Sequence, residues 1–63
     1  MTTRQKLTCQ QTDQLLSEPG WKQISRQDTQ SRTTIIYRRD NETIKTSHDP
    51  ITGLNCDHEY WKD

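Results

Sequence analysis

The 63-residue sequence contains no valine, alanine or phenylalanine, and only 16 residues are apolar by the usual count. A chain of this length buries only about 60% of the surface that its unfolded form exposes. Leucine and isoleucine make up nine of the 63 residues, but the formal net charge is zero, which weakens an argument for disorder. We therefore expect one small domain, residues 1–63, with a marginal core that gains stability from dimerisation, a partner or a staple.

Long apolar runs are absent as well. No stretch approaches the roughly 18 residues that a membrane-spanning helix needs, and the N-terminus lacks the apolar segment of a signal peptide. The sequence therefore predicts no membrane contact and a cytoplasmic location. Charge is uneven: residues 1–47 carry eight Lys/Arg and five Asp/Glu, and residues 48–63 carry one Lys and four Asp/Glu. This is either a basic body with an acidic tail or the ordinary variation of a solvated surface.

The scarce apolar residues concentrate in residues 33–45, which predict a β-hairpin. Residues 33–37 are β-branched or aromatic and suit a pleated, half-buried surface. Asp40 and Asn41 tolerate the left-handed conformations of a tight turn. A two-residue turn pairs Arg39 with Glu42, Tyr37 with Ile44, and Ile35 with Thr46.

That register assigns the hairpin side chains to two faces, because they alternate along each strand. The predicted core face carries Ile35, Tyr37 and Ile44. The predicted wet, basic face carries Ile36, Arg38, Thr43 and Lys45. A turn of another length would exchange these roles on one strand.

The rest of the chain is expected to be less regular. Thr8 and Gln11 fit a capping box that starts a helix over about residues 9–17, and Pro19 with Gly20 ends it. Residues 21–26 are a candidate strand, with Trp21 sealing the helix against the sheet. Residues 27–32 are predicted to be a loop, and residues 48–53 a turn.

The predicted fold is therefore α+β. One N-terminal helix packs on a small antiparallel sheet of two or three strands, followed by an irregular C-terminal segment. For residues 54–63 the pattern does not decide between a short helix and an extended tail. Residues 1–6 are expected to fray, and residues 62–63 are a second candidate for fraying. The predicted core consists of Leu15, Leu16, Trp21, Ile24, Ile35, Tyr37 and Ile44.

Two cysteines and two histidines are the candidates for chemistry. A Cys9–Cys56 disulfide would contribute roughly 4 kcal/mol, but without a secretion signal free thiols are the default. Together with His48 and His58 the thiols are of the right type for zinc, yet no CxxC or HxxxH spacing is present. Cys56 and a histidine could form a nucleophile and its base, but Cys56 and His58 lie two residues apart in a polar tail with no visible scaffold to orient them. We therefore predict no metal, no cofactor and no catalytic residue.

Partner-binding candidates come from the hairpin and the chain end. Arg38, Arg39 and Lys45 are basic residues that can follow phosphates, but Tyr37, the nearest stacking aromatic, points to the other face. Tyr60 and Trp61 form either a flap over the core or an exposed anchor for a protein. The predicted partner-binding residues are Ile36, Arg38, Arg39, Lys45, Tyr60 and Trp61.

Two family resemblances accompany these patterns. Leu7-Thr8, Leu15-Leu16 and Pro19-Gly20-Trp21 resemble the opening of pterin carbinolamine dehydratases. That family's histidine cluster and second helix have no counterpart here, so its activity is not carried over. Leu15-Leu16, Gly20-Trp21 and the following strand pair resemble the HicA-type messenger-RNA-cleaving toxins. Residues 31–33 lack the catalytic histidine that this resemblance would require.

The leading functional hypothesis is a non-enzymatic interaction module, a small regulator or inhibitor that acts through a protein partner or as a homodimer. Three features support it: the core is small, no set of catalytic residues is recognisable, and the predicted sheet has an open edge that another chain could pair with. The alternative is an RNA- or DNA-binding protein, in one version a HicA-like ribonuclease, that uses the basic face of the hairpin. A third, enzymatic hypothesis depends on His48.

Overall fold

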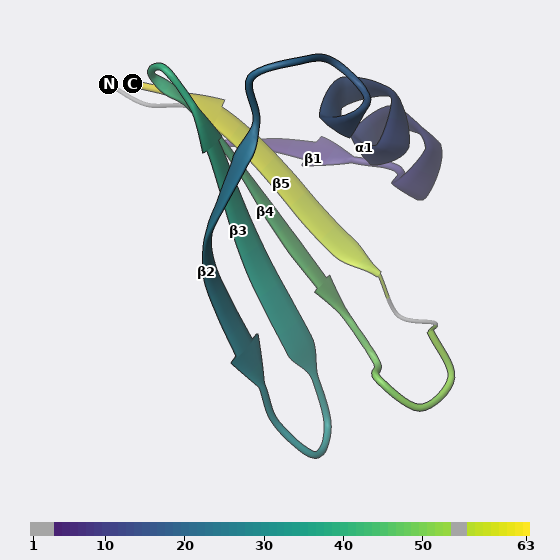
Figure 1. The fold of residues 1–63 in the computed structure, drawn as a ribbon. Helices are drawn as coiled ribbons and strands as arrows, with labels where there is room; N and C mark the ends of the chain where they lie inside the picture. Colours follow the sequence, from purple (N-terminus) through teal and green to yellow (C-terminus); the bar gives the residue numbers. More distant parts are fainter. Residues whose placement is uncertain (1–3, 54–55) are drawn as a thin grey trace.

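The computed structural model describes residues 4–53 and 56–63, and it holds one short helix and a single five-stranded antiparallel sheet (Figure 1). The elements along the chain are β1 (Gln5–Leu7), α1 (Cys9–Leu16), β2 (Lys22–Asp28), β3 (Thr33–Arg39), β4 (Glu42–His48) and β5 (Asp57–Lys62). Their order across the sheet is β1-β5-β4-β3-β2. Strands β2 to β5 thus form a meander, and β1 joins its far edge. The fold is mostly β, so the prediction of an α+β fold with two or three strands is wrong.

The two missed strands lie at the ends of the chain. The segment predicted to be irregular contains β5, which pairs with β4 on one side and β1 on the other. Within that segment, residues 54–55 lie outside the described residues. Residues 5 and 6, expected to fray, belong to β1, whereas residues 1–3 lie outside the described residues. Lys62 ends β5, and the backbone N–H of Asp63 donates to the carbonyl of Asn41 (2.7 Å).

The predicted hairpin and its register are confirmed. Arg39 is opposite Glu42, Tyr37 is opposite Ile44, and Ile35 is opposite Thr46. Asp40 adopts a φ of 52°, the left-handed conformation that a two-residue turn requires.

The predicted helix start is also confirmed. Thr8 accepts a hydrogen bond from the backbone of Gln11, whose side chain accepts from the backbone of Thr8, so both halves of the capping box are present. The chain then turns at Gly20, whose φ is 100°. A Cβ at this position would lie 3.0 Å from Cδ of Arg39, so glycine serves both the turn and the close approach.

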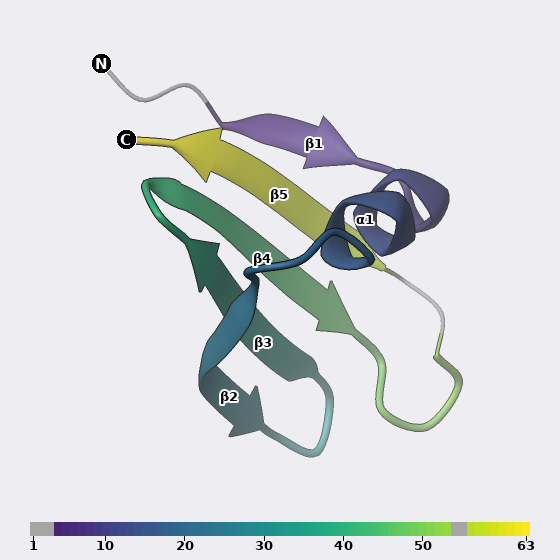
Figure 2. The same cartoon turned by 45° about the horizontal axis from the view of Figure 1, so that its top comes forward.

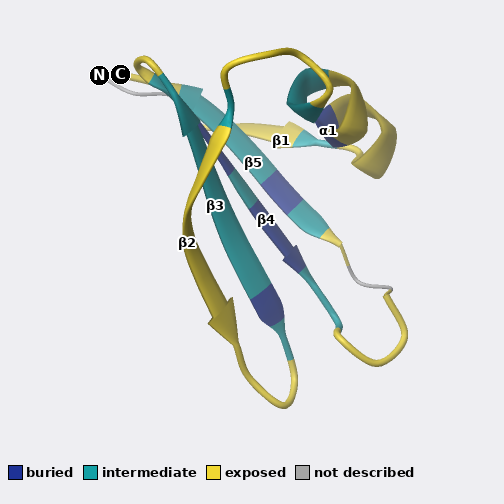
Figure 3. Ribbon diagram, viewed as in Figure 1, coloured by how far each residue is buried: buried dark blue, intermediate teal, exposed yellow. Residues whose placement is uncertain are grey.

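Strand β2 begins and ends later than predicted, and it contains an irregularity. The pairing with β3 shifts between Gln23 and Ser25, which leaves Ile24 at a bulge. Ile24 is 58% exposed, so its assignment to the core is wrong. Figure 3 shows β2 exposed along its length.

The registers define two faces of the sheet, because side chains alternate along each strand. The covered face carries Leu7, Ile35, Tyr37, Arg39, Ile44, His58 and Tyr60. The open face carries Ile36, Arg38, Thr43, Lys45, Glu59 and Trp61. Helix α1 lies beside β1 and the start of β5 (Figure 2), and it contacts the covered face through Cys9 and His58. Among the described residues, no helix or strand lies over the open face.

The core is thin. Among the described residues, Ile44 in the central strand β4 is the only fully buried apolar side chain. The other buried side chains are polar: Thr12, Thr33, Thr43, Thr46, Ser47 and His58. The threonine and serine hydroxyls in this group form hydrogen bonds within the protein. Thr46, for example, donates to the backbone carbonyl of Ile35 on the neighbouring strand (3.2 Å). The remaining predicted core residues other than Ile24 and Ile44 are half-buried.

Helix α1 does not seal the covered face. An open pocket separates it from β1 and β5, lined by Gln5, Leu7, Gln11, Gln14, Leu15, Glu18 and Tyr60. Only Thr12 of the helix is buried. In the part of the chain that the structure describes, no helix is long and apolar enough to cross a membrane.

Candidate functional site

The structure divides the predicted partner-binding residues between the two faces. Ile36, Arg38, Lys45 and Trp61 lie on the open face, and Arg39 and Tyr60 lie on the covered face. One interaction surface therefore cannot contain all six. The division follows from the strand register, since Tyr60 and Trp61 are neighbours in β5 and point in opposite directions.

Arg39 and Tyr60 are held in a network on the covered face. Nε of Arg39 donates to Glu42 (2.9 Å), its Nη1 donates to Glu18 (2.9 Å), and its guanidinium lies 4.5 Å from the ring centroid of Trp21. The hydroxyl of Tyr60 donates to the other carboxylate oxygen of Glu42 (2.7 Å). These contacts join the turn after α1 to the sheet, which gives both residues a structural role.

The same network shifts two pKa values. The hydrogen bond from Arg39, and then that from Tyr60, holds the pKa of Glu42 below its ordinary value. The hydrogen bond to Glu42 raises the pKa of Tyr60. Both shifts favour the observed arrangement, in which a charged Glu42 accepts from a protonated Tyr60.

Several charges on the other side of the sheet and at its rim are paired. Three ion pairs join basic side chains to the acidic end of the chain: Arg4–Glu59 (3.6 Å), Lys6–Asp57 (3.1 Å) and Arg38–Asp63 (2.6 Å). The guanidinium of Arg4 also lies 4.3 Å from the ring centroid of Trp61. In the fold, basic residues from the first part of the sequence are thus neutralised by acidic residues from its last part. A phosphate backbone would have to displace these carboxylates, which weakens the case for nucleic acid.

Around these pairs, the open face offers apolar surface. Ile36 lies opposite Lys45, and Trp61 lies opposite Thr43; Ile36 and Trp61 are both half-buried. Thr43 is buried between its neighbours and accepts a hydrogen bond from Arg38 (2.9 Å). The open face therefore carries two half-buried apolar side chains, separated by Thr43 and Lys45, among charges of both signs, a mixture that suits contact with another protein.

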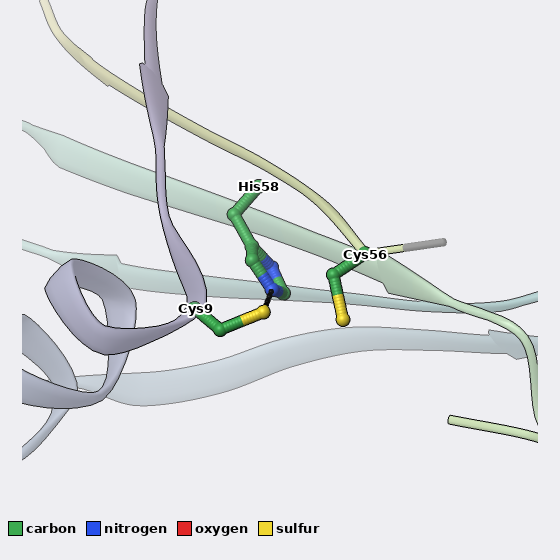
Figure 4. A group of neighbouring side chains, drawn as sticks. All are labelled: Cys9, Cys56 and His58. Atoms are coloured by element: carbon green, nitrogen blue, oxygen red, sulfur yellow. Dashed lines mark hydrogen bonds between the residues drawn. The ribbon is translucent and has the colours of Figure 1, made fainter. Parts of the chain in front are cut away.

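A second candidate site lies where α1 meets β5. Cys9 is the first residue of α1, Cys56 directly precedes β5, and His58 is the second residue of β5 (Figure 4). Sγ of Cys9 lies 3.4 Å from Nε2 of His58, and one ligand atom from each of the three residues lies within 4.8 Å of the other two. We call these residues the thiol–imidazole cluster. Both cysteines are free thiols, and His48 is not part of the cluster.

The electrostatics of the cluster follow from its geometry. A side-chain hydrogen bond with Cys56 raises the pKa of Cys9. Burial lowers the pKa of His58, which favours the neutral imidazole. Nε2 is the ring nitrogen of His58 that faces the Cys9 thiol. The other ring nitrogen, Nδ1, is buried without a hydrogen-bond partner within the described part of the chain.

Local spacing gave little sign of this cluster. Cys9 and His58 are 49 positions apart in the sequence. The short Cys-Asp-His triplet at residues 56–58 was the one available signal, and it needed the unpredicted strand β5 to bring it beside α1.

Comparisons of this chain with protein-family models, with curated proteins and with solved structures give no match. The two resemblances described above therefore assign no family. The function has to be argued from the geometry of the open face and of the thiol–imidazole cluster.

Proposed function

We propose that this protein is a non-catalytic interaction module that associates with a second copy of itself through the open face. One observation carries the proposal. The open face carries the half-buried side chains of Ile36 and Trp61, the latter beside Arg4, with no described helix or strand over them, while Ile44 is the only fully buried apolar side chain among the described residues. A sheet with one covered face commonly gains stability when a second layer covers the other.

The dimensions of the molecule suit such an interface. Two sheets pack face to face at a spacing of about 10 Å. The two longest extents of the whole molecule are 31 and 25 Å, so one sheet face has at most about the ~800 Å² that each partner buries in a standard interface. The face supplies no area beyond that, and its rim is charged. We therefore expect a reversible dimer with a dissociation constant on the order of micromolar.

The charge distribution permits a second copy as the partner, because Arg38, Asp57 and Glu59 are already paired within the chain and leave little charge to oppose the approach of a like face. Basic Arg38 and Lys45 lie on β3 and β4, whereas acidic Asp57 and Glu59 lie on β5. Two copies related by a twofold axis can place β5 of one against β3 and β4 of the other. The formal net charge of zero means that the copies do not repel each other at long range.

Sedimentation equilibrium over a wide range of protein concentration tests the proposal. The average mass of the wild-type protein should rise from 7.5 kDa towards twice that value. Ile36→Lys replaces an apolar side chain of the open face with a charge and should weaken association about tenfold or more. The matched control, Ile51→Lys, changes a residue that is 85% exposed in the turn after β4, and it should behave as wild type.

A second variant keeps the test independent of folding. Lys45→Glu reverses one charge on the open face and should also weaken association, with circular dichroism confirming that the sheet is retained. A wild-type protein that stays at 7.5 kDa up to millimolar concentration would refute the proposal. It would equally fail if both variants, while folded, associated as strongly as the Ile51→Lys control.

Two alternatives predict other results. A regulator or inhibitor that acts through a different protein would remain monomeric alone. A nucleic-acid-binding protein would be retained on heparin, with retention falling steeply as salt is added. The second alternative loses support because Arg38 is paired with Asp63, and Arg39 with Glu42 and Glu18.

A further inference from the structure

We propose that the thiol–imidazole cluster binds one thiophilic divalent cation per chain, with Zn²⁺ as the natural candidate, through Cys9, Cys56 and Nε2 of His58. This site is independent of the self-association proposed above, because its residues lie between α1 and β5 and not among the open-face residues. The cluster joins two segments that lie far apart in the sequence, the start of α1 and the start of β5, as Figure 4 shows.

Distances support a tetrahedral site. With Zn–S bonds of about 2.3 Å and Zn–N bonds of about 2.0 Å, a tetrahedron has edges of about 3.5 Å between sulfur and nitrogen and about 3.8 Å between two sulfurs. The observed distance from Sγ of Cys9 to Nε2 of His58 is 3.4 Å. All three ligand atoms lie within 4.8 Å of one another, so closing the remaining distances requires a shift of at most about 1.0 Å between the two sulfurs and about 1.3 Å between Cys56 and His58.

The donor set selects the metal. Two thiolates and a neutral imidazole are ligands for zinc and similar soft or borderline ions, whereas Mg²⁺ and Ca²⁺ require oxygen ligands. Cys9 is the first residue of α1 and His58 lies in β5, so the two ligands come from different elements. Binding releases the two thiol protons to solvent and changes no oxidation state, so two thiolates balance the charge of the cation.

Two features set the expected strength and shape of the site. Cys9 and Cys56 are exposed, so water or an external ligand can take the fourth position. Nδ1 of His58 lacks a hydrogen-bond acceptor among the described residues, and such an outer partner commonly accounts for a 10–100-fold gain in affinity. We therefore expect weaker binding than in a four-ligand structural zinc site.

The site would act as a staple between the helix and the sheet. Apart from Thr12, the side chains of α1 are half-buried or exposed, and an open pocket lies beneath the helix. A cation held by the first residue of α1 and by β5 would fix the helix on the covered face. Small domains with little core commonly use such a metal link.

Titration of the reduced, metal-free protein with Co²⁺ is the direct test. Tetrahedral cobalt gives visible d–d bands and a thiolate-to-cobalt charge-transfer band, and both should saturate at one ion per chain. Addition of Zn²⁺ should bleach them. The titration is performed at concentrations below and above those at which the protein associates, so that an ion shared between two copies would be recognised by its half stoichiometry.

Variants assign the ligands. Cys56→Ser and His58→Gln should each lower the cobalt affinity about tenfold or more, whereas His48→Gln should leave it unchanged. Cys56 lies outside the strands and is exposed, so its variant should fold as wild type does. Zn²⁺ should raise the melting temperature of the wild-type protein and of His48→Gln equally, and raise that of Cys56→Ser by clearly less at the same concentration.

Three results would overturn the proposal. The first is the absence of tetrahedral cobalt bands from the reduced wild-type protein at millimolar metal. The second is equal affinity in Cys56→Ser and His48→Gln. The third is a stoichiometry of one ion per two chains, which would mean that the ligands of a single chain do not complete the site.

Discussion

The two faces of the sheet use the same strands in different ways. On the covered face, Arg39 and Glu42 are about 19% and 18% exposed, and their ion pair is tied into hydrogen bonds with Tyr60 and Glu18. Outside it, the Lys6–Asp57 pair exposes 77% and 45% of its two side chains. Shielded, networked charges fix a structure, whereas exposed pairs contribute little to stability. The comparison indicates that the Arg39–Glu42 network contributes more to the stability of the fold than the Lys6–Asp57 pair does, in line with the proposal that the open face serves association.

The largest expected effect lies at the centre of the covered face. Ile44→Ala should lower the free energy of unfolding by roughly 2–5 kcal/mol, because it leaves a cavity around the one fully buried apolar side chain. Ile24→Ala is the matched control, since Ile24 is 58% exposed, and its cost should stay within about 0.5 kcal/mol. Urea unfolding measures both. Equal losses in the two variants would contradict the placement of the core.

The helix cap provides the next effect. Thr8→Ala removes the side chain that accepts from the backbone of Gln11, and it should cost about 1 kcal/mol of unfolding free energy. Ser31→Ala, in the exposed loop before β3, is the control and should be neutral. If the two variants unfold at the same urea concentration, the capping box contributes nothing to the stability of the protein.

The hydrogen bonds to Glu42 predict that the free energy of unfolding depends on pH. Because the folded protein holds the pKa of Glu42 below its ordinary value of 4.5, the unfolded chain takes up the proton first as the pH falls. The stabilisation is therefore fully present above about pH 4.5 and is lost as the pH falls through the lower, folded pKa. Glu42→Gln should flatten the acid side of the stability profile.

Urea unfolding from pH 7 down to pH 3 measures this profile. Asp13→Asn, on an exposed position of α1, is the control and should leave the slope that is due to Glu42 in place. An unchanged slope in Glu42→Gln would show that the network does not stabilise the folded state.

The smallest effect is expected for the exposed ion pairs. Lys6→Gln removes the pair with Asp57 and should change the unfolding free energy by less than about 1 kcal/mol, and by less still at high salt. The change is measured at low and high ionic strength. A loss larger than that of Thr8→Ala would erase the contrast between the two faces.

Local signals predicted the parts of this fold that depend on neighbouring residues. The turn at Asp40 and Asn41 fixed the hairpin register, and Thr8 with Gln11 fixed the start of the helix. The outer strands depend on distant pairing, such as Gln5 with Tyr60, and neither segment has an alternation that marks a strand. The bulge at Ile24 is another long-range property, since it is defined against β3.

The candidate sites show the same limit. The hairpin register places Ile36, Arg38 and Lys45 on one face, as predicted, whereas their role in binding a partner stays a prediction. Tyr60 and Trp61 were grouped because they are adjacent in sequence, and a strand separates adjacent side chains. The thiol–imidazole cluster required β5 to bring His58 beside the first turn of α1, which no local pattern specifies.

The two tryptophans provide the most direct test of the contrast between the faces, because each reports on one of them. Trp21 contacts Arg39 of the covered face, and Trp61 belongs to the open face. As ¹⁵N-labelled protein is diluted from millimolar to low micromolar concentration, the indole N–H signal of Trp61 should shift and that of Trp21 should stay in place. Two stationary signals, or equal shifts of both, would contradict the assignment of the open face as the surface of association.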